Sequence, residues 1–347
     1  MWNEKELKEK LKYINELSKN IEDKDKKFLT LCNKATILEM LELLNANKLK
    51  INTSLLIVTN ELSLKRVEKE YSDYQTTGFD KYSKDLEFSF ELCKNIARIG
   101  PFEEVKDLPL TSKEECFEEV IDFATKLEDK ELKTDIISIL GDKDKIYITD
   151  KKISKRYDGT NFELVIFKEF YIASRANSTM LLHEIIHSID TKRNGSRTNM
   201  YPYSDEVSAY ALQYYKNMQA DNFNDLNDLI VSCRNTLTTL FRKNYILLND
   251  EEMNFSNIMV KNTTTFENLL TIKSCLIGCI FAKKILDDEE NGLKDYNEML
   301  STRFSMDTTP DYSKWGITND VIIDYSKNLI TNFKENIIGK KQGGKSI

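Results

Sequence analysis

The first part of the chain has the apolar spacing of helices. Apolar residues recur every three or four positions, as at Leu7, Leu11 and Ile14, and this pattern predicts helical structure over residues 5–47. The stretch 88–99 has a helical pattern as well. Glycine–proline and leucine–proline pairs then interrupt the pattern. We therefore expect an N-terminal helical domain over residues 1–108.

A start signal predicts the next helix. Ser112 and Glu115 have the spacing of a capping box, in which each side chain accepts a hydrogen bond from the backbone N–H of the other residue. The apolar residues that follow predict a helix that runs toward Leu127.

The pattern changes to that of strands in the middle of the chain. Residues 145–149 alternate and are rich in β-branched side chains, which predicts a strand. Residues 150–160 are polar and predict a loop, with Asp158-Gly159 as a turn signal. Residues 161–173 predict one or two further strands.

Both histidines of the chain lie in one H-E-x-x-H motif. His183 and His187 are four residues apart, so they project from the same face of a helix, for which Asn177 or Ser178 is the expected N-cap. Two imidazoles on one face can bind a zinc ion, and Glu184 beside them can take the proton of a zinc-bound water. The alternative is an ordinary helix with two surface histidines.

The apolar residues around the motif favour the metal. They predict a mostly buried helix and are Leu181, Leu182, Ile185, Ile186 and Ile189. Each buried polar group without a partner costs about 1–3 kcal/mol, so three such groups on a buried helix indicate a shared ligand.

A catalytic zinc site needs a third protein ligand and an open position for water. No third histidine exists, so the ligand is a carboxylate or a thiolate. Glu206 is the best carboxylate because it opens a second predicted helix over residues 205–218, in which the small Ala209 permits close packing. Asp205 is the alternative. An acid in this place is also favoured by the helix dipole alone.

The motif residues support a family resemblance. They read His183-Glu184-x-x-His187-x-x-Asp190, followed by Glu206-x-x-Ala209-x-Ala211. Over roughly residues 141–218 the chain resembles the gluzincin metallopeptidases, and it looks most like the catalytic domains of anthrax lethal factor and the clostridial Pro-Pro endopeptidases. The resemblance implies His183, His187 and Glu206 as zinc ligands and Glu184 as general base.

The family also uses a tyrosine before the glutamate ligand to stabilise the oxyanion. At the usual position this chain has Asn199, so the role is displaced, and Tyr201 and Tyr203 are the nearest tyrosines. In any such reaction negative charge builds up on the carbonyl oxygen, and a hydrogen-bond donor to that oxygen typically lowers the activation barrier by about 3 kcal/mol. Either tyrosine can equally be a loop aromatic that packs on the core, and Arg175 and Arg197 are weaker candidates.

Composition narrows the possible partners and the compartment. A net charge of −7 argues against general binding to nucleic acid, and no apolar run is long enough to span a bilayer. The first residues lack the features of a secretion signal, so we expect a cytoplasmic protein, with leaderless export left open. Six scattered cysteines, none in a C-x-x-C pair, predict free thiols.

These patterns together predict an α+β fold, in which a mostly helical chain carries a small zincin-type mixed sheet packed on the H-E-x-x-H helix. We expect an N-terminal helical domain over residues 1–108, a zincin core over 109–220, a helical region over 221–338 and a flexible basic tail over 339–347.

The predicted function is zinc-dependent hydrolysis of a peptide or protein substrate, with one zinc ion per chain. Two alternatives stay open: a non-catalytic binding or regulatory protein on the same scaffold, and a secreted proteolytic effector.

Overall fold

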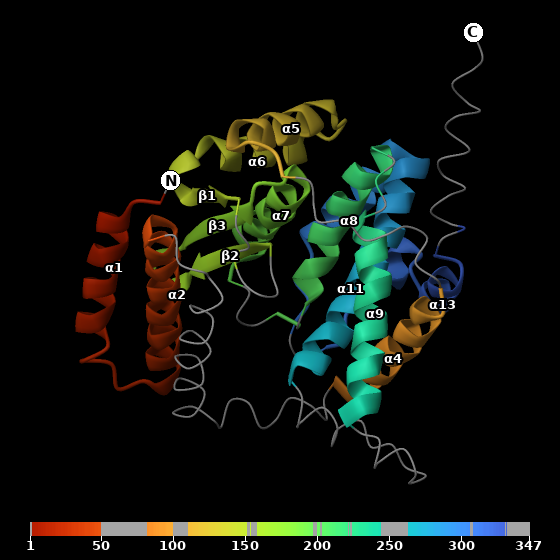
Figure 1. Ribbon diagram of the computed structural model, residues 1–347, viewed down its shortest axis with the longest axis horizontal. Helices are drawn as coiled ribbons and strands as arrows, with labels where there is room; N and C mark the ends of the chain where they lie inside the picture. Colours follow the sequence, from red (N-terminus) through yellow and green to blue (C-terminus); the bar gives the residue numbers. More distant parts are fainter. Residues whose placement is uncertain are drawn as a thin grey trace. The chain divides into compact units, whose positions relative to one another are not determined.

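The computed structural model shows a mostly helical protein with one small mixed sheet, which confirms the predicted α+β class (Figure 1). The structure describes residues 2–49, 82–99, 110–150, 153, 158–196, 200–201, 203–220, 222, 224–243, 263–305, 308–329 and 331. The predicted boundary at residue 108 and the predicted tail over 339–347 lie outside the described residues.

The chain forms two compact units that do not follow its linear order. One comprises Met1–Thr77, Pro109–Lys126 and Lys133–Ile189. The other comprises Gly78–Leu108, Leu127–Leu132 and Asp190–Ile347. The four-part division expected from the sequence stays a prediction.

The first unit begins with two helices, α1 (Glu4–Leu17) and α2 (Lys24–Leu49), which pack on each other and cover most of the stretch 5–47 that was expected to be helical. The side chain of Asn3 caps α1 by accepting from the N–H groups of Lys5 and Glu6. Leu7 and Ile14 are buried, as their spacing predicts.

The sheet contains three strands, β1 (Ile146–Thr149), β2 (Gly159–Leu164) and β3 (Glu169–Arg175), in the order β1-β3-β2. β1 runs parallel to β3, and β2 runs antiparallel to it. The strand predicted over residues 145–149 is confirmed, and residues 161–173 contain parts of two strands. The loop prediction was wrong at its end, because Gly159 and Thr160 pair with β3.

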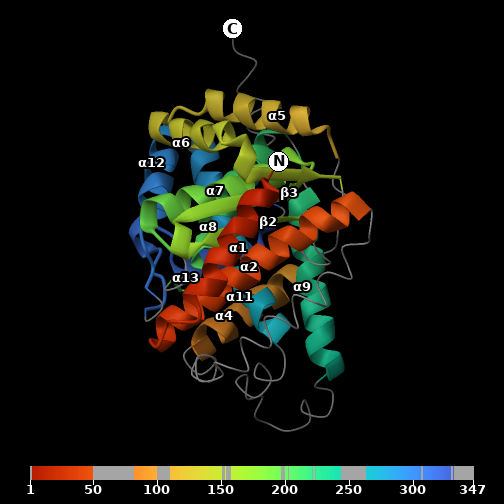
Figure 2. The same ribbon diagram turned by 90° about the vertical axis from the view of Figure 1, so that its left-hand side faces the viewer.

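The two faces of the sheet pack on different helices. On one face, Trp2 packs its ring against Tyr147, Phe162 and Tyr171 at centroid distances of 5.0, 5.6 and 6.4 Å. Figure 2 shows α1 and α2 in front of this face. On the other face, Asn161 reaches α7 (Ser178–Asn194). The sheet is therefore the middle layer between α1–α2 and the helix that carries both histidines.

Two further helices, α5 (Lys113–Lys126) and α6 (Lys130–Gly141), precede the sheet in the chain. The predicted capping box of α5 is present. The N–H of Ser112 donates to Glu115 at 2.7 Å, and the N–H of Glu115 donates to the Ser112 hydroxyl oxygen at 3.1 Å.

The second unit is a bundle of helices. Its members are α4 (Ser83–Ala97), α8 (Ser204–Gln219), α9 (Asn224–Lys243), α11 (Thr263–Asp287), α12 (Glu289–Leu300) and α13 (Asn319–Lys327). The long helix α11 contacts each of the other five. Gly278 permits its close approach to α8, since a Cβ there would lie 2.7 Å from the Cβ of Tyr210. None of the helices in the described ranges has both the length and the hydrophobicity that a membrane crossing requires.

Candidate metal centre

The helix α7 begins at a firmly held turn. The side-chain oxygen of Asn177 accepts from the N–H groups of Thr179 and Met180, both at 3.0 Å, so Asn177 is the N-cap. The other predicted cap, Ser178, donates its hydroxyl to Glu119 instead. This anchoring sets the start of the helix at Ser178, five residues before His183.

The interior position of the motif is confirmed. His183, Glu184 and His187 are only 6%, 4% and 3% exposed. Their apolar neighbours have no exposed surface, and these are Leu181, Leu182, Ile185, Ile186 and Ile189. The three polar groups therefore lie where water does not satisfy them, as the apolar pattern of the helix implied.

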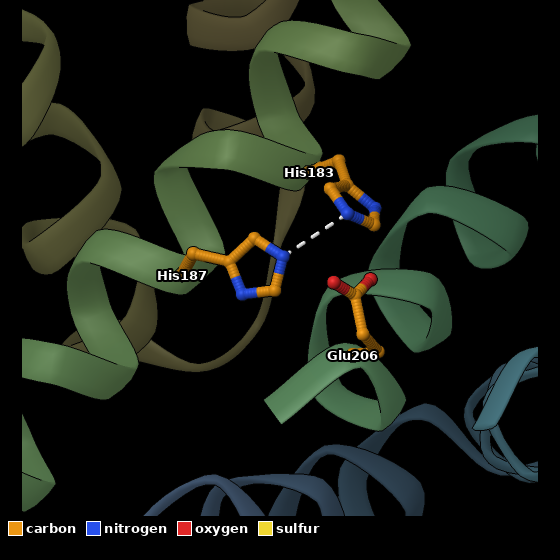
Figure 3. A group of neighbouring side chains, drawn as sticks. All are labelled: His183, His187 and Glu206. Carbon is orange, nitrogen blue, oxygen red and sulfur yellow. Dashed lines mark hydrogen bonds between the residues drawn. The ribbon is translucent and has the colours of Figure 1, made fainter. Parts of the chain in front are cut away.

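The two histidines and Glu206 form one group of side chains. Glu206 lies in the first turn of α8, and one ligand atom from each of the three residues lies within 4.8 Å of the others. Figure 3 shows both imidazoles on one helix, with the Glu206 carboxylate directed toward them. These three residues can hold a metal ion.

The neighbouring candidates stay outside this group. Asp205, the alternative third ligand, is not part of it, and no cysteine of the described segments joins a metal-binding cluster. All six cysteines are free, which agrees with the expectation of unpaired thiols.

The distance between the two imidazoles tests whether zinc fits. Their Nε2 atoms are 3.1 Å apart. Two nitrogens bound to one tetrahedral zinc at about 2.0–2.1 Å lie about 3.3–3.4 Å from each other. A small increase in the distance between the two Nε2 atoms reaches this geometry. Two imidazoles with one carboxylate are also an established ligand set of catalytic zinc.

The same 3.1 Å distance also suits an N–H···N hydrogen bond between the rings, which are T-shaped with an interplanar angle of 78°. The two arrangements differ in protons. A hydrogen bond requires a proton on one Nε2 atom, whereas a metal requires the lone pairs of both. Metal binding therefore releases any proton that the pair shares.

Glu184 lies against the first residue of β2. A Cβ at Gly159 would be 2.6 Å from the Oε1 atom of Glu184, so this side chain occupies the space beside the glycine. Asn161 of the same strand donates to the carbonyl of Glu184 at 3.2 Å and to the hydroxyl of Ser188 at 2.6 Å. The sequence pattern predicts neither role, because it indicates a turn at Gly159 and gives no sign that Asn161 faces α7.

The predicted oxyanion donors have separate surroundings. Tyr201 is buried and donates its hydroxyl to Asp85; burial and this carboxylate raise the pKa of Tyr201 above its ordinary value. Tyr203 is half-buried, and its φ of 62° is uncommon for a residue with a side chain. Arg175 is ion-paired with Asp158 at 3.4 Å. Arg197, like Asn199, lies outside the described residues.

Comparisons with protein-family models, with curated proteins and with solved structures found no match to this chain. The resemblance to the gluzincins therefore stays a prediction that depends on the motif residues, and the function has to be argued from the chemistry of the site.

Proposed function

We propose that the protein is a zinc-dependent metalloendopeptidase. The observation that carries the proposal is the convergence of His183, His187 and Glu206 within 4.8 Å, with Glu184 next to the first histidine. This donor set leaves a fourth position for water on a tetrahedral ion, which is typical of catalytic rather than structural zinc.

The chain's own residues supply the proton transfers. A bound zinc ion would provide an activated water and polarise the scissile carbonyl. Glu184 then accepts a proton from the attacking water and returns it to the leaving nitrogen. Its 4% exposure keeps bulk water from competing for that proton.

The strand β2 is the proposed substrate platform. It stands at one end of the strand order and, among the described residues, pairs only with β3. An extended peptide can add to such an edge through main-chain hydrogen bonds. Because Gly159 at the start of β2 touches Glu184, a peptide bound along this edge would pass close to the general base.

A tyrosine remains the proposed donor to the developing oxyanion. Tyr201 is the weaker of the two candidates, because its hydroxyl donates to Asp85, and the test is therefore made on Tyr203. Replacement of Tyr203 by Phe is expected to lower kcat by about 100-fold, the usual cost of a lost oxyanion donor. Equal activity of the Phe variant would exclude this role.

The central experiment replaces Glu184 by Gln in purified, zinc-loaded protein and follows cleavage of a peptide library. The amide keeps the shape of the side chain but cannot accept the proton, so zinc should stay bound while hydrolysis falls by about 10²–10⁴-fold. Wild-type protein that binds zinc and cleaves nothing would instead support the non-catalytic alternative. Full activity of the Gln variant would refute the role of Glu184.

A second pair of variants tests the ligand set. Glu206→Gln should reduce the zinc content sharply, because a neutral amide is a much poorer ligand than a carboxylate. Asp205→Asn is the matched control, since Asp205 is the adjacent acid and lies outside the group. Equal zinc content in the two variants would remove Glu206 from the site.

A further inference from the structure

Gly159 occupies a place where no larger residue fits without displacing Glu184. A Cβ built on Gly159 would lie 2.6 Å from Oε1, 2.9 Å from Cγ and 3.1 Å from Cδ of Glu184. Distances below 3 Å are shorter than any van der Waals contact between such atoms. The side chain of Glu184 therefore uses the volume that the glycine leaves open.

The backbone does not explain this glycine. Among the described residues, the glycines with positive φ are Gly195 and Gly316, and Gly159 is not one of them. Gly159 lies in regular strand and pairs with Ser174 of β3. Any residue can adopt that conformation, so the requirement for glycine comes from the neighbouring carboxylate.

Hydrogen bonds hold the strand on both sides of Gly159. The carbonyl of Asp158 accepts from the N–H of Arg175 at 2.6 Å, and the two side chains form an ion pair. Asn161 fastens the other side of Gly159 to α7. The three nearest atoms that a Cβ at position 159 would meet, Oε1, Cγ and Cδ, all belong to the side chain of Glu184. A Cβ at position 159 would therefore displace the carboxylate and leave the strand in place.

We propose that Gly159 is the positioning residue for the general base, which deepens the proposed function and rests on it. The missing side chain lets the Glu184 carboxylate lie against the start of β2, one residue along α7 from His183. Because every atom that the Cβ would meet belongs to the one side chain of Glu184, Gly159→Ala should alter catalysis much more than stability. A displacement of about 1 Å can reduce the rate by about 100-fold.

The test compares Gly159→Ala with Gly141→Ala, both loaded with zinc. Gly141 is the matched control, because a Cβ there meets nothing within 4 Å. For Gly159→Ala we expect kcat to fall by about 100-fold with little change in KM, since the base acts in the transition state. Zinc content and Tm should match those of wild type, and Gly141→Ala should behave as wild type throughout.

A crystal structure of zinc-loaded Gly159→Ala provides a readout that does not depend on activity. The Glu184 carboxylate should be displaced, with His183, His187 and Glu206 unmoved. An unmoved carboxylate, or a kcat within about threefold of wild type, would overturn the proposal. If wild-type protein hydrolyses no peptide, the proposed function fails, and this structure still decides whether Gly159 positions Glu184.

Discussion

A buried ion pair in the second unit offers the sharpest test of the physical reasoning. Asp85 of α4 and Lys273 of α11 have side chains that are 10% and 11% exposed, and Nζ lies 2.9 Å from Oδ1. The other carboxylate oxygen of Asp85 accepts the hydroxyl of Tyr201. Replacement of Asp85 by Asn keeps the shape but leaves the Lys273 ammonium buried without its counter-charge.

The expected cost follows from this burial. Removal of one partner of a buried pair destabilises a protein by about 3–5 kcal/mol. In a domain of this size about 1 kcal/mol lowers Tm by about 2–4 °C, so Asp85→Asn should lower Tm by about 6–20 °C. Any affinity for zinc should fall as well, because the carbonyl of Tyr201 accepts from the N–H and the hydroxyl of Ser204, which begins the helix of the proposed ligand Glu206.

The assay is urea denaturation of metal-free protein, with zinc affinity measured separately. Lys273→Met alone should also destabilise, because it leaves the Asp85 carboxylate without its cation. The double variant should lose at least about 1 kcal/mol less than the sum of the single variants, since neither charge is then stranded. A loss below about 1 kcal/mol for Asp85→Asn, or simple additivity, would refute the reasoning.

Three further predictions concern stability. Burial, with a contribution from Glu42, raises the pKa of Glu39 to about 7, so the folded state keeps a proton that the unfolded chain loses as pH rises from about 4.5 to about 7. The ionised carboxylate therefore destabilises the fold at higher pH. In urea denaturation, Glu39→Gln should increase the free energy of unfolding by up to about 3 kcal/mol at pH about 8 and leave it unchanged at pH about 4. Gly278→Ala should lower Tm by several degrees, because its Cβ would meet α8, whereas Gly141→Ala should not. Burial raises the pKa of Tyr296 well above its ordinary value, so the stability of the fold should fall above pH about 10, where tyrosines of the unfolded chain ionise. In an alkaline titration, the rise in tyrosinate absorbance and the loss of helical circular dichroism should then occur together.

The parts of the site that the sequence could predict are those that depend on local spacing. The four-residue interval between His183 and His187 places them on one helical face whatever surrounds the helix. The capping box at Ser112 and the cap at Asn177 are local in the same sense, and the structure confirms both. The prediction of Glu206 as a ligand needed only the expectation of a second helix, and the structure places Glu206 in one group with His183 and His187.

The contacts that stayed hidden join distant parts of the chain. Asp85 and Tyr201 are 116 residues apart, and no periodic pattern connects them. The sequence therefore could not predict that the hydroxyl of Tyr201 donates to Asp85. Trp2 lies 143 residues from Lys145, whose carbonyl it binds at 3.0 Å, and no sequence spacing predicts that it covers one face of the sheet.

The two glycines show why positioning residues are harder to predict than ligands. A ligand is recognised by the atoms that it has, and His183 carries the same ring in any fold. Gly159 and Gly278 act through atoms that they lack, and the lack matters only once Glu184 or α8 lies opposite. From the sequence alone, a glycine in a strand or helix pattern indicates a turn or a tolerated weak point of a helix, because those are its common local roles. Tests of the proposed catalytic function should therefore include the small residues that face the polar ones, and Gly159 is the position at which such a test is most direct.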